Sequence, residues 1–157
     1  MAALFVVILL FAAPAQEAAQ ARPAIPIAVI VHEDVPVDEL SLSELRRIFR
    51  GERLFWAGDL TIKLLAPPRG SREREVLLGR IYERGSEAEY QRFWINKLFD
   101  KGGQTAPKIT GSPQMSAGLV REIPGAVALV PADRIPRGVK VLRIDGRSPG
   151  EAGYPLP

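Results

Sequence analysis

The sequence of 157 residues is long enough for one domain of ordinary size and too short for two well-packed ones. Hydrophobic residues make up 46% of the chain and charged residues 25%, a balance typical of globular proteins rather than disordered or fibrous ones. Cysteine is absent and histidine occurs once, which excludes disulfides, thiolate metal sites, cysteine nucleophiles and multi-histidine zinc sites. The formal net charge of +3 fits an anionic partner, but it equally fits an ordinary basic surface.

The beginning of the chain has the features of an export signal. Residues 3–13 form an uninterrupted apolar run, too short to cross a hydrocarbon core of about 30 Å comfortably. Small residues follow and end in an Ala-Gln-Ala site, which predicts cleavage before Arg22. We therefore predict a signal peptide at residues 1–21 and a periplasmic domain over residues 22–157, with an uncleaved membrane anchor as the alternative.

The first elements predicted after the leader are a strand, a helix and a second strand. Residues 25–31 form an apolar, β-branched run that predicts a buried strand. Ser41 is followed at capping-box spacing by Glu44 and then by apolar residues at helical intervals, so we expect a helix that ends near Gly51. Residues 60–65 predict the second strand.

A loop and two helices are expected next. The Pro-Pro-Arg-Gly-Ser loop at residues 67–71 leads directly into a predicted helix that is capped by Ser71 and ends near Arg84. Ser86, with Glu89 at capping-box spacing, begins the following helix. Its stripe of Tyr90, Phe93, Trp94, Lys97 and Leu98 is more typical of a core-facing surface than of a base-stacking platform.

The last third of the chain predicts one more helix and two more strands. Ser112 and Pro113 are typical of a helix start, and the helix should end before Pro124. Residues 126–130 and 139–144 predict strands, and a turn-rich tail follows. Strands that alternate with helices predict an α/β domain in which helices cover a sheet.

Four stretches, in this order, resemble the phosphate-type substrate-binding proteins of ABC transporters. They are residues 48–56 (IFRGERLFW), 62–76, 124–130 (PGAVALV) and 139–156. The resemblance covers nearly the whole chain after the leader. It implies a periplasmic-binding-protein-like lobe, with a central mixed β-sheet of about four to five strands covered by helices. The start of the family's first lobe has no counterpart here, so the chain resembles the second lobe standing alone.

The resemblance also implies an anion site. In this family a Gly-Ser loop at a helix N-terminus holds the oxyanion, and such a terminus offers unpaired N–H groups and partial positive charge. At the matching positions here, Gly70 would let the backbone approach the anion, and Ser71 would offer its hydroxyl and N–H. Arg69 and Arg72 would supply charge-assisted hydrogen bonds. These four residues are the predicted site for phosphate or a related oxyanion.

The loop departs from the family pattern in ways that keep a second interpretation open. The family reads Ser-Gly-Thr where this chain reads Ser71-Arg72-Glu73, so a carboxylate replaces a hydroxyl donor. The family's aspartate, which accepts a hydrogen bond from protonated phosphate, belongs to the lobe without a counterpart. In this second interpretation, Ser71 is only a helix cap. The alternative is a non-catalytic periplasmic interaction module that has lost tight ligand binding.

Two other groups of residues have weaker functional interpretations. His32, Glu33 and Asp34 follow the first strand, but no nucleophile accompanies them, so we expect no enzyme. Arg46, Arg47, Arg50 and Arg53 form either a solvated face or a docking surface for an acidic partner.

We expect no metal, cofactor or nucleic acid. Apart from the oxyanion, the expected partners are an ABC transporter membrane component or another periplasmic protein, with membrane contact only through an uncleaved leader.

Overall fold

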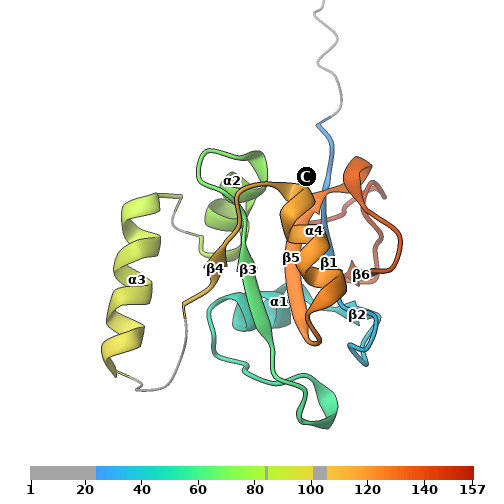
Figure 1. Ribbon diagram of the computed structural model, residues 1–157. Coiled ribbons are helices and arrows are strands. Elements are labelled where there is room, and N and C mark those ends of the chain that lie inside the picture. The colour runs from blue at the N-terminus through green and yellow to red at the C-terminus, as the bar shows by residue number, and fades with distance from the viewer. Residues whose placement is uncertain (1–23, 84, 101–105) are drawn as a thin grey trace, which may run out of the picture.

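The computed structural model describes residues 24–83, 85–100 and 106–157, and the predicted leader lies outside them. These residues form a mixed six-stranded sheet of order β2-β6-β1-β5-β3-β4 with helices on both faces (Figure 1). The predicted α/β lobe is therefore confirmed. No helix in the described ranges combines the length and hydropathy that a membrane span requires.

The middle of the sheet is antiparallel and its outer part is parallel. β1 pairs antiparallel with both β5 and β6, whereas β3 runs parallel to β5 and β4 runs parallel to β3. The strands are β1 (Ile27–Val31), β2 (Glu39–Leu40), β3 (Lys63–Ala66), β4 (Lys108–Ile109), β5 (Ala126–Pro131) and β6 (Lys140–Ile144). The four predicted strands match β1, β3, β5 and β6. The sequence analysis missed β2 and β4, because two residues are too few to show a period.

The predicted helices are present, and their serine caps form as expected. They are α1 (Leu42–Phe49), α2 (Arg72–Val76), η2 (Leu77–Ile81), α3 (Glu87–Asp100) and α4 (Pro113–Glu122), with 3₁₀ turns η1 (Ala57–Asp59) and η3 (Ala132–Arg134). The capping box of α1 is complete, since the Glu44 N–H donates to Ser41 Oγ and the Ser41 N–H donates to Glu44 Oε2. The helix expected to reach Arg84 instead ends with η2, a π-helical turn.

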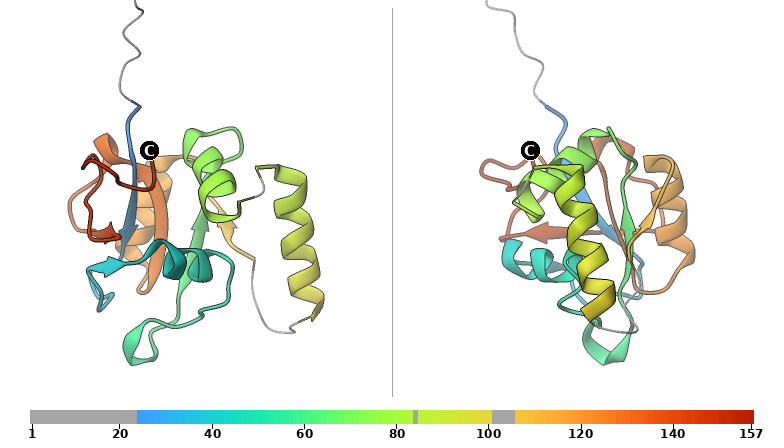
Figure 2. Two further views of the ribbon diagram at one scale, coloured as in Figure 1. Left: turned by 180° about the vertical axis from the view of Figure 1, so that it is seen from behind. Right: turned by 90° about the vertical axis from the view of Figure 1, so that its left-hand side faces the viewer.

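Helices lie on both sides of the sheet (Figure 2, right), and each face carries a hydrophobic layer. On β1, residues Ile27, Val29 and Val31 face the layer that includes α1, α2 and part of α3. Ala28 and Ile30 face the layer under α4. Because both faces are covered, the strand reads as an unbroken apolar run rather than as an alternating one.

Helix α3 is held to the body through its first half. The Trp94 indole N–H donates to the Tyr82 hydroxyl at 2.9 Å, and that hydroxyl donates to the Phe49 carbonyl at 2.5 Å. Burial raises the pKa of the Tyr82 phenol, which keeps its proton in place as a donor. The second half is different: Leu98 is 40% exposed and Phe99 85% exposed. The predicted core stripe therefore ends one turn earlier than we expected.

A glycine ahead of β5 sets the path of the chain beside the start of β3. Gly125 has φ +78°, and its carbonyl accepts the buried Trp56 indole N–H at 2.9 Å. A Cβ on Gly125 would lie 2.1 Å from the Thr61 carbonyl oxygen. Both the backbone conformation and the available space therefore require glycine here.

We predict that Gly125→Ala destabilises the fold by more than about 3 kcal/mol, because the methyl group would collide with backbone at a strained φ. Urea unfolding followed by circular dichroism measures the change. Gly118→Ala is the matched control, because a Cβ there meets no atom within 4 Å. It lies within α4 and should stabilise the protein by about 0.5–1 kcal/mol. Equal stability of Gly125→Ala and wild type would contradict this account.

Candidate functional site

The four residues of the predicted site lie together where β3 ends and α2 begins. Gly70 has φ +75°, and a Cβ there would meet nothing within 4 Å, so the backbone is open to the outside. Ser71 follows as the N-cap of α2, and Arg72 is the first helical residue. The loop lies at the carboxyl end of a parallel strand, which is the usual position of ligand sites in open α/β sheets.

A second helix begins beside this loop. Thr110 follows β4 and its N–H donates to the Ala66 carbonyl at the end of β3, at 2.9 Å. Ser112 then caps α4 by accepting the Met115 N–H. The starts of α2 and α4 thus lie at the same end of the sheet, where β3 and β4 end (Figure 1). The sequence predicts the helix start at Ser112, but not its position near the end of β3, because that position depends on the pairing of β3 with β4.

The structure divides the polar groups of Ser71 between the helix and the site. Ser71 Oγ accepts the Arg74 N–H at 3.2 Å, and the Ser71 N–H donates to the Pro68 carbonyl at 3.3 Å. The hydroxyl keeps its own proton and can still donate it to an anion. The N–H groups of Arg72 and Glu73 belong to the first turn, where the helix itself offers no acceptor. The available donors are therefore the Ser71 hydroxyl and the N–H groups of Arg72 and Glu73. The Ser71 N–H, which we expected to bind the anion, is instead committed to the Pro68 carbonyl.

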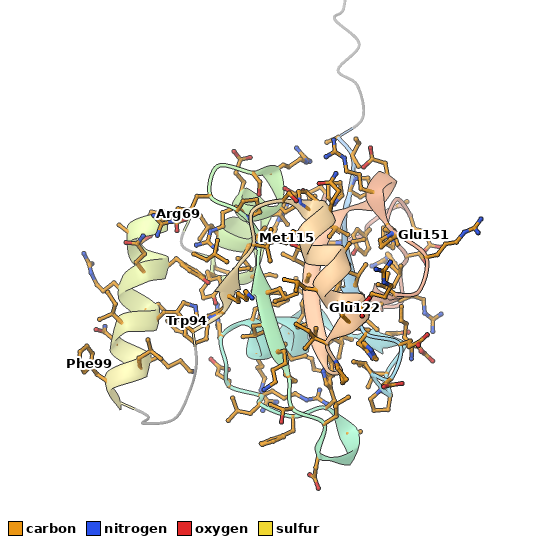
Figure 3. The ribbon with its side chains drawn as sticks, in the orientation of Figure 1. Arg69, Trp94, Phe99, Met115, Glu122 and Glu151 are labelled. Carbon is orange, nitrogen blue, oxygen red and sulfur yellow. The ribbon has the colours of Figure 1, made fainter. Side chains whose placement is uncertain are left out.

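The charged side chains around the loop are partly committed to the protein itself. The side chain of Arg69 is 59% exposed. Its Nε lies 3.2 Å from Oε1 of Glu87, which belongs to the first turn of α3. Figure 3 shows Arg69 beside that end of α3. Arg72 is exposed, whereas Glu73 is only 4% exposed in the first turn of α2. A carboxylate there already interacts favourably with the helix N-terminus.

An ion pair between a buried arginine and a partly exposed glutamate lies under the loop. Arg74, 1% exposed, makes two hydrogen bonds to the Glu87 carboxylate, from Nε at 3.0 Å and from Nη2 at 2.6 Å. Its guanidinium also lies 3.9 Å from the ring centroid of Tyr90. Nη1 is buried and has no hydrogen-bond partner among the described residues. A usable sequence signal was present, because Arg74 precedes Leu78 and Ile81 on the buried face of the helix.

The Glu87 carboxyl titrates below its usual range. The hydrogen bonds from Arg74 are the main reason that its pKa is lowered, and they outweigh the opposing effect of burial. The nearby charge of Arg69 lowers this pKa further. Glu87 is therefore ionised at neutral pH and is the shared counter-charge of two arginines.

His32, Arg46 and Arg50, from the two weaker candidates in the sequence, make contacts that hold the fold. His32 Nδ1 accepts the Asp34 N–H at 3.1 Å, which holds a turn and places the proton of a neutral ring on Nε2. Arg46 and Arg50 both form ion pairs with Glu83 and donate to the carbonyls of Arg80 and Ile81. These arginines hold the end of η2. No group of three or more metal-ligating side chains occurs within the described ranges.

The chain is thus an α/β lobe, with a mixed sheet, helices on both of its faces, and α2 and α4 beginning after the parallel strands β3 and β4. The solved structures that this chain is similar to include one described as a phosphate ABC transporter substrate-binding protein from Clostridium perfringens, with bound phosphate. There the identity is 20% and the TM-score 0.63, over 79% of this chain and 46% of that one.

Two further solved structures are similar at comparable levels. An ABC-type phosphate transport receptor from Vibrio cholerae has 16% identity and a TM-score of 0.66, over 83% of this chain and 53% of that one. PstS from Borrelia burgdorferi has 14% identity and a TM-score of 0.60, over 79% and 49%. The chain thus spans about half the length of these proteins, and the likeness establishes the fold. No family model and no curated protein matches the sequence.

We predict that Glu87→Gln destabilises the protein by about 3 kcal/mol at pH 7, because it leaves the Arg74 guanidinium buried without a counter-charge. The lowered pKa of Glu87 stabilises the wild type above about pH 4.5, and this contribution is lost as the pH falls through the lowered value. In the Glu87→Gln variant, the free energy of unfolding should therefore fall less between pH 7 and acidic pH than it does in the wild type. Urea unfolding at pH 7 and at about pH 3 measures both effects.

Glu122→Gln is the control for this prediction. It removes the acid of an exposed ion pair with Arg121, which should change the free energy of unfolding by less than about 1 kcal/mol. If Glu87→Gln lowered the free energy of unfolding as little as Glu122→Gln does, the ion pair of Arg74 with Glu87 would not be a principal support of the fold.

Proposed function

We propose that this chain is an exported solute-binding-protein-like module that takes up phosphate or a related oxyanion in ABC-type transport. The anion would lie at the loop of residues 69–72. The observation that carries the proposal is the open backbone at Gly70, which leads into the first turn of α2 between Arg69 and Arg72. Unpaired N–H groups, a helix dipole and two guanidinium groups form an anion site from general physical chemistry. The likeness to solved phosphate-binding lobes supports the same choice of ligand.

The geometry favours weak rather than tight binding by this lobe alone. Arg69 would have to share its charge between the anion and Glu87, and Glu73 adds a second carboxylate nearby. An anion that one lobe covers stays half in water, where each hydrogen bond contributes little net free energy. We therefore expect a dissociation constant of about 1 mM for phosphate, equivalent to about −4 kcal/mol. Tighter binding would need a partner chain or a second copy to cover the loop.

A second candidate is an interaction module that keeps the lobe but has lost tight ligand binding. One observation favours it: the ion pair of Arg69 with Glu87 already satisfies one of the two arginines of the predicted site. In this alternative the loop is a structural connection between α2 and α3. Phosphate affinity separates the two candidates.

Isothermal calorimetry with phosphate tests the proposal on the chain that lacks residues 1–21. We predict saturable binding near 1 mM, weakened at least about fivefold by Arg69→Gln or Arg72→Gln because each removes a charge-assisted donor. Ser71→Gly should also weaken binding. Glycine remains an acceptable N-cap, so this variant removes the hydroxyl at a cost of only a few tenths of a kcal/mol in stability.

Arg137→Gln is the matched control for the arginine variants, because Arg137 is an exposed arginine in the connection before β6. It should leave phosphate binding unchanged. No heat at about 10 mM phosphate would reject unaided capture in favour of the interaction module. Binding that survives all three substitutions in the loop would place the anion elsewhere.

Export is a separate part of the proposal, with its own test. If the leader is a signal peptide, the protein secreted by a bacterial host should begin at Arg22, because cleavage follows the Ala-Gln-Ala site. Intact-mass spectrometry of the periplasmic fraction measures this directly. An unprocessed chain in the membrane fraction would instead support the uncleaved anchor. Replacement of Ala19 and Ala21 by larger residues should block processing without affecting the folded domain.

A further inference from the structure

A pocket lies at the opposite end of β3 from Ser71. It has a volume of about 470 Å³, within the range of small-molecule sites, and it lies between the start of β3, β4, α3 and the chain before η1. Trp94 extends from α3 toward this part of the body (Figure 3). The pocket shares no residue with the loop at residues 69–72, so it is a separate site.

The walls of the pocket are mainly apolar. Leu65 is buried in the layer under α4, and Ile62 and Trp94 are buried in the layer on the other face of the sheet. Leu54 and Phe55 are exposed large hydrophobic residues at the surface. Exposed aromatic and aliphatic side chains beside a concave surface of this size are typical of a binding site for an apolar body.

Among the described residues that line the pocket, every charged side chain is basic. They are Arg53, Lys63 and Lys108. Leu65 pairs with Lys108 across β3 and β4, so Lys63, two residues earlier, lies on the same face of the sheet in a diagonal position. Neither lysine forms an ion pair with an acidic side chain in the described part of the chain. Two like charges at this spacing repel each other unless an anion lies between them.

The third cation is already oriented. Arg53 Nε donates to the Phe55 carbonyl at 3.1 Å, and its guanidinium lies 5.9 Å from the ring centroid of Trp56. Its nearest acid, Glu44, is 3.9 Å away at the limit of an ion pair. Arg53 therefore keeps hydrogen-bond donors for an incoming anion at the border of the pocket.

We propose that this pocket binds a small amphipathic anion, with an aromatic or alkyl body against Phe55 and an acidic group between Lys63 and Lys108. The apolar walls favour an organic anion over inorganic phosphate, because phosphate would lose water there without gaining hydrogen bonds from the walls. This site does not depend on the oxyanion site at α2. Excess phosphate leaves it unaffected.

Two matched dyes test the charge and the apolar body separately. The probe 8-anilinonaphthalene-1-sulfonate carries a sulfonate, and N-phenyl-1-naphthylamine has the same rings without it. In fluorescence titrations we expect one saturable site for the anionic dye. The double variant Lys63→Gln/Lys108→Gln should lower the affinity for the anionic dye at least about tenfold, and should change the affinity for the neutral dye by less than about twofold. Phe55→Ser should lower the affinity for both dyes.

The control double variant is Arg134→Gln/Arg137→Gln, which removes two exposed positive charges from the connection between β5 and β6. It should bind both dyes as the wild type does. Unfolding midpoints of all variants separate altered binding from loosened structure, which itself takes up the anionic dye. Equal affinity of the wild type and Lys63→Gln/Lys108→Gln for the anionic dye would overturn the proposal. Non-saturable binding of the anionic dye would also overturn it. So would displacement of the dye by phosphate at concentrations near the dissociation constant of phosphate for the α2 loop.

Discussion

The buried guanidinium of Arg74 is the constraint on which the arrangement of this lobe depends. A charge that is 1% exposed needs a counter-charge and hydrogen bonds, and Glu87 supplies both from the start of α3. Tyr90, one turn further along α3, packs its ring against the same guanidinium. The pair therefore fixes where α3 begins relative to α2. It acts together with the hydrogen bonds from Trp94 through Tyr82 to α1.

The same carboxylate also connects the fold to the candidate site. Glu87 attracts Arg69 from the loop, so the side chain that would bind an anion is oriented by a group that stabilises the core. An anion at the proposed site would compete with Glu87 for Arg69, but it could not displace Glu87 from the buried Arg74 without a large cost in stability. Affinity and stability would thus be coupled through one acidic side chain.

Features that depend on local signals could be predicted from the sequence. The apolar runs of β1 and β5 and the serine caps of α1, α2 and α4 need only neighbouring residues, and all of them are present. The position of Gly70 and Ser71 between a strand and a helix was predictable for the same reason. Features that depend on distant partners were not. The pairing of β3 with β4, the hydrogen bond of Thr110 with Ala66 and the ion pair of Arg69 with Glu87 join segments that carry no shared local pattern.

The π-helical turn at Leu77–Ile81 determines the direction in which the chain leaves α2. The Tyr82 N–H donates to the Leu77 carbonyl, five residues back, so this turn holds one residue more than an α-helical turn. Loss of a single residue, such as Gly79, would restore regular α-helical geometry, but it would rotate everything after it by about 100° around the helix axis. Tyr82 would then point away from the Phe49 carbonyl. Among homologues, a one-residue length difference in this turn should therefore be accompanied by replacement of Tyr82, since its hydroxyl would no longer reach the Phe49 carbonyl.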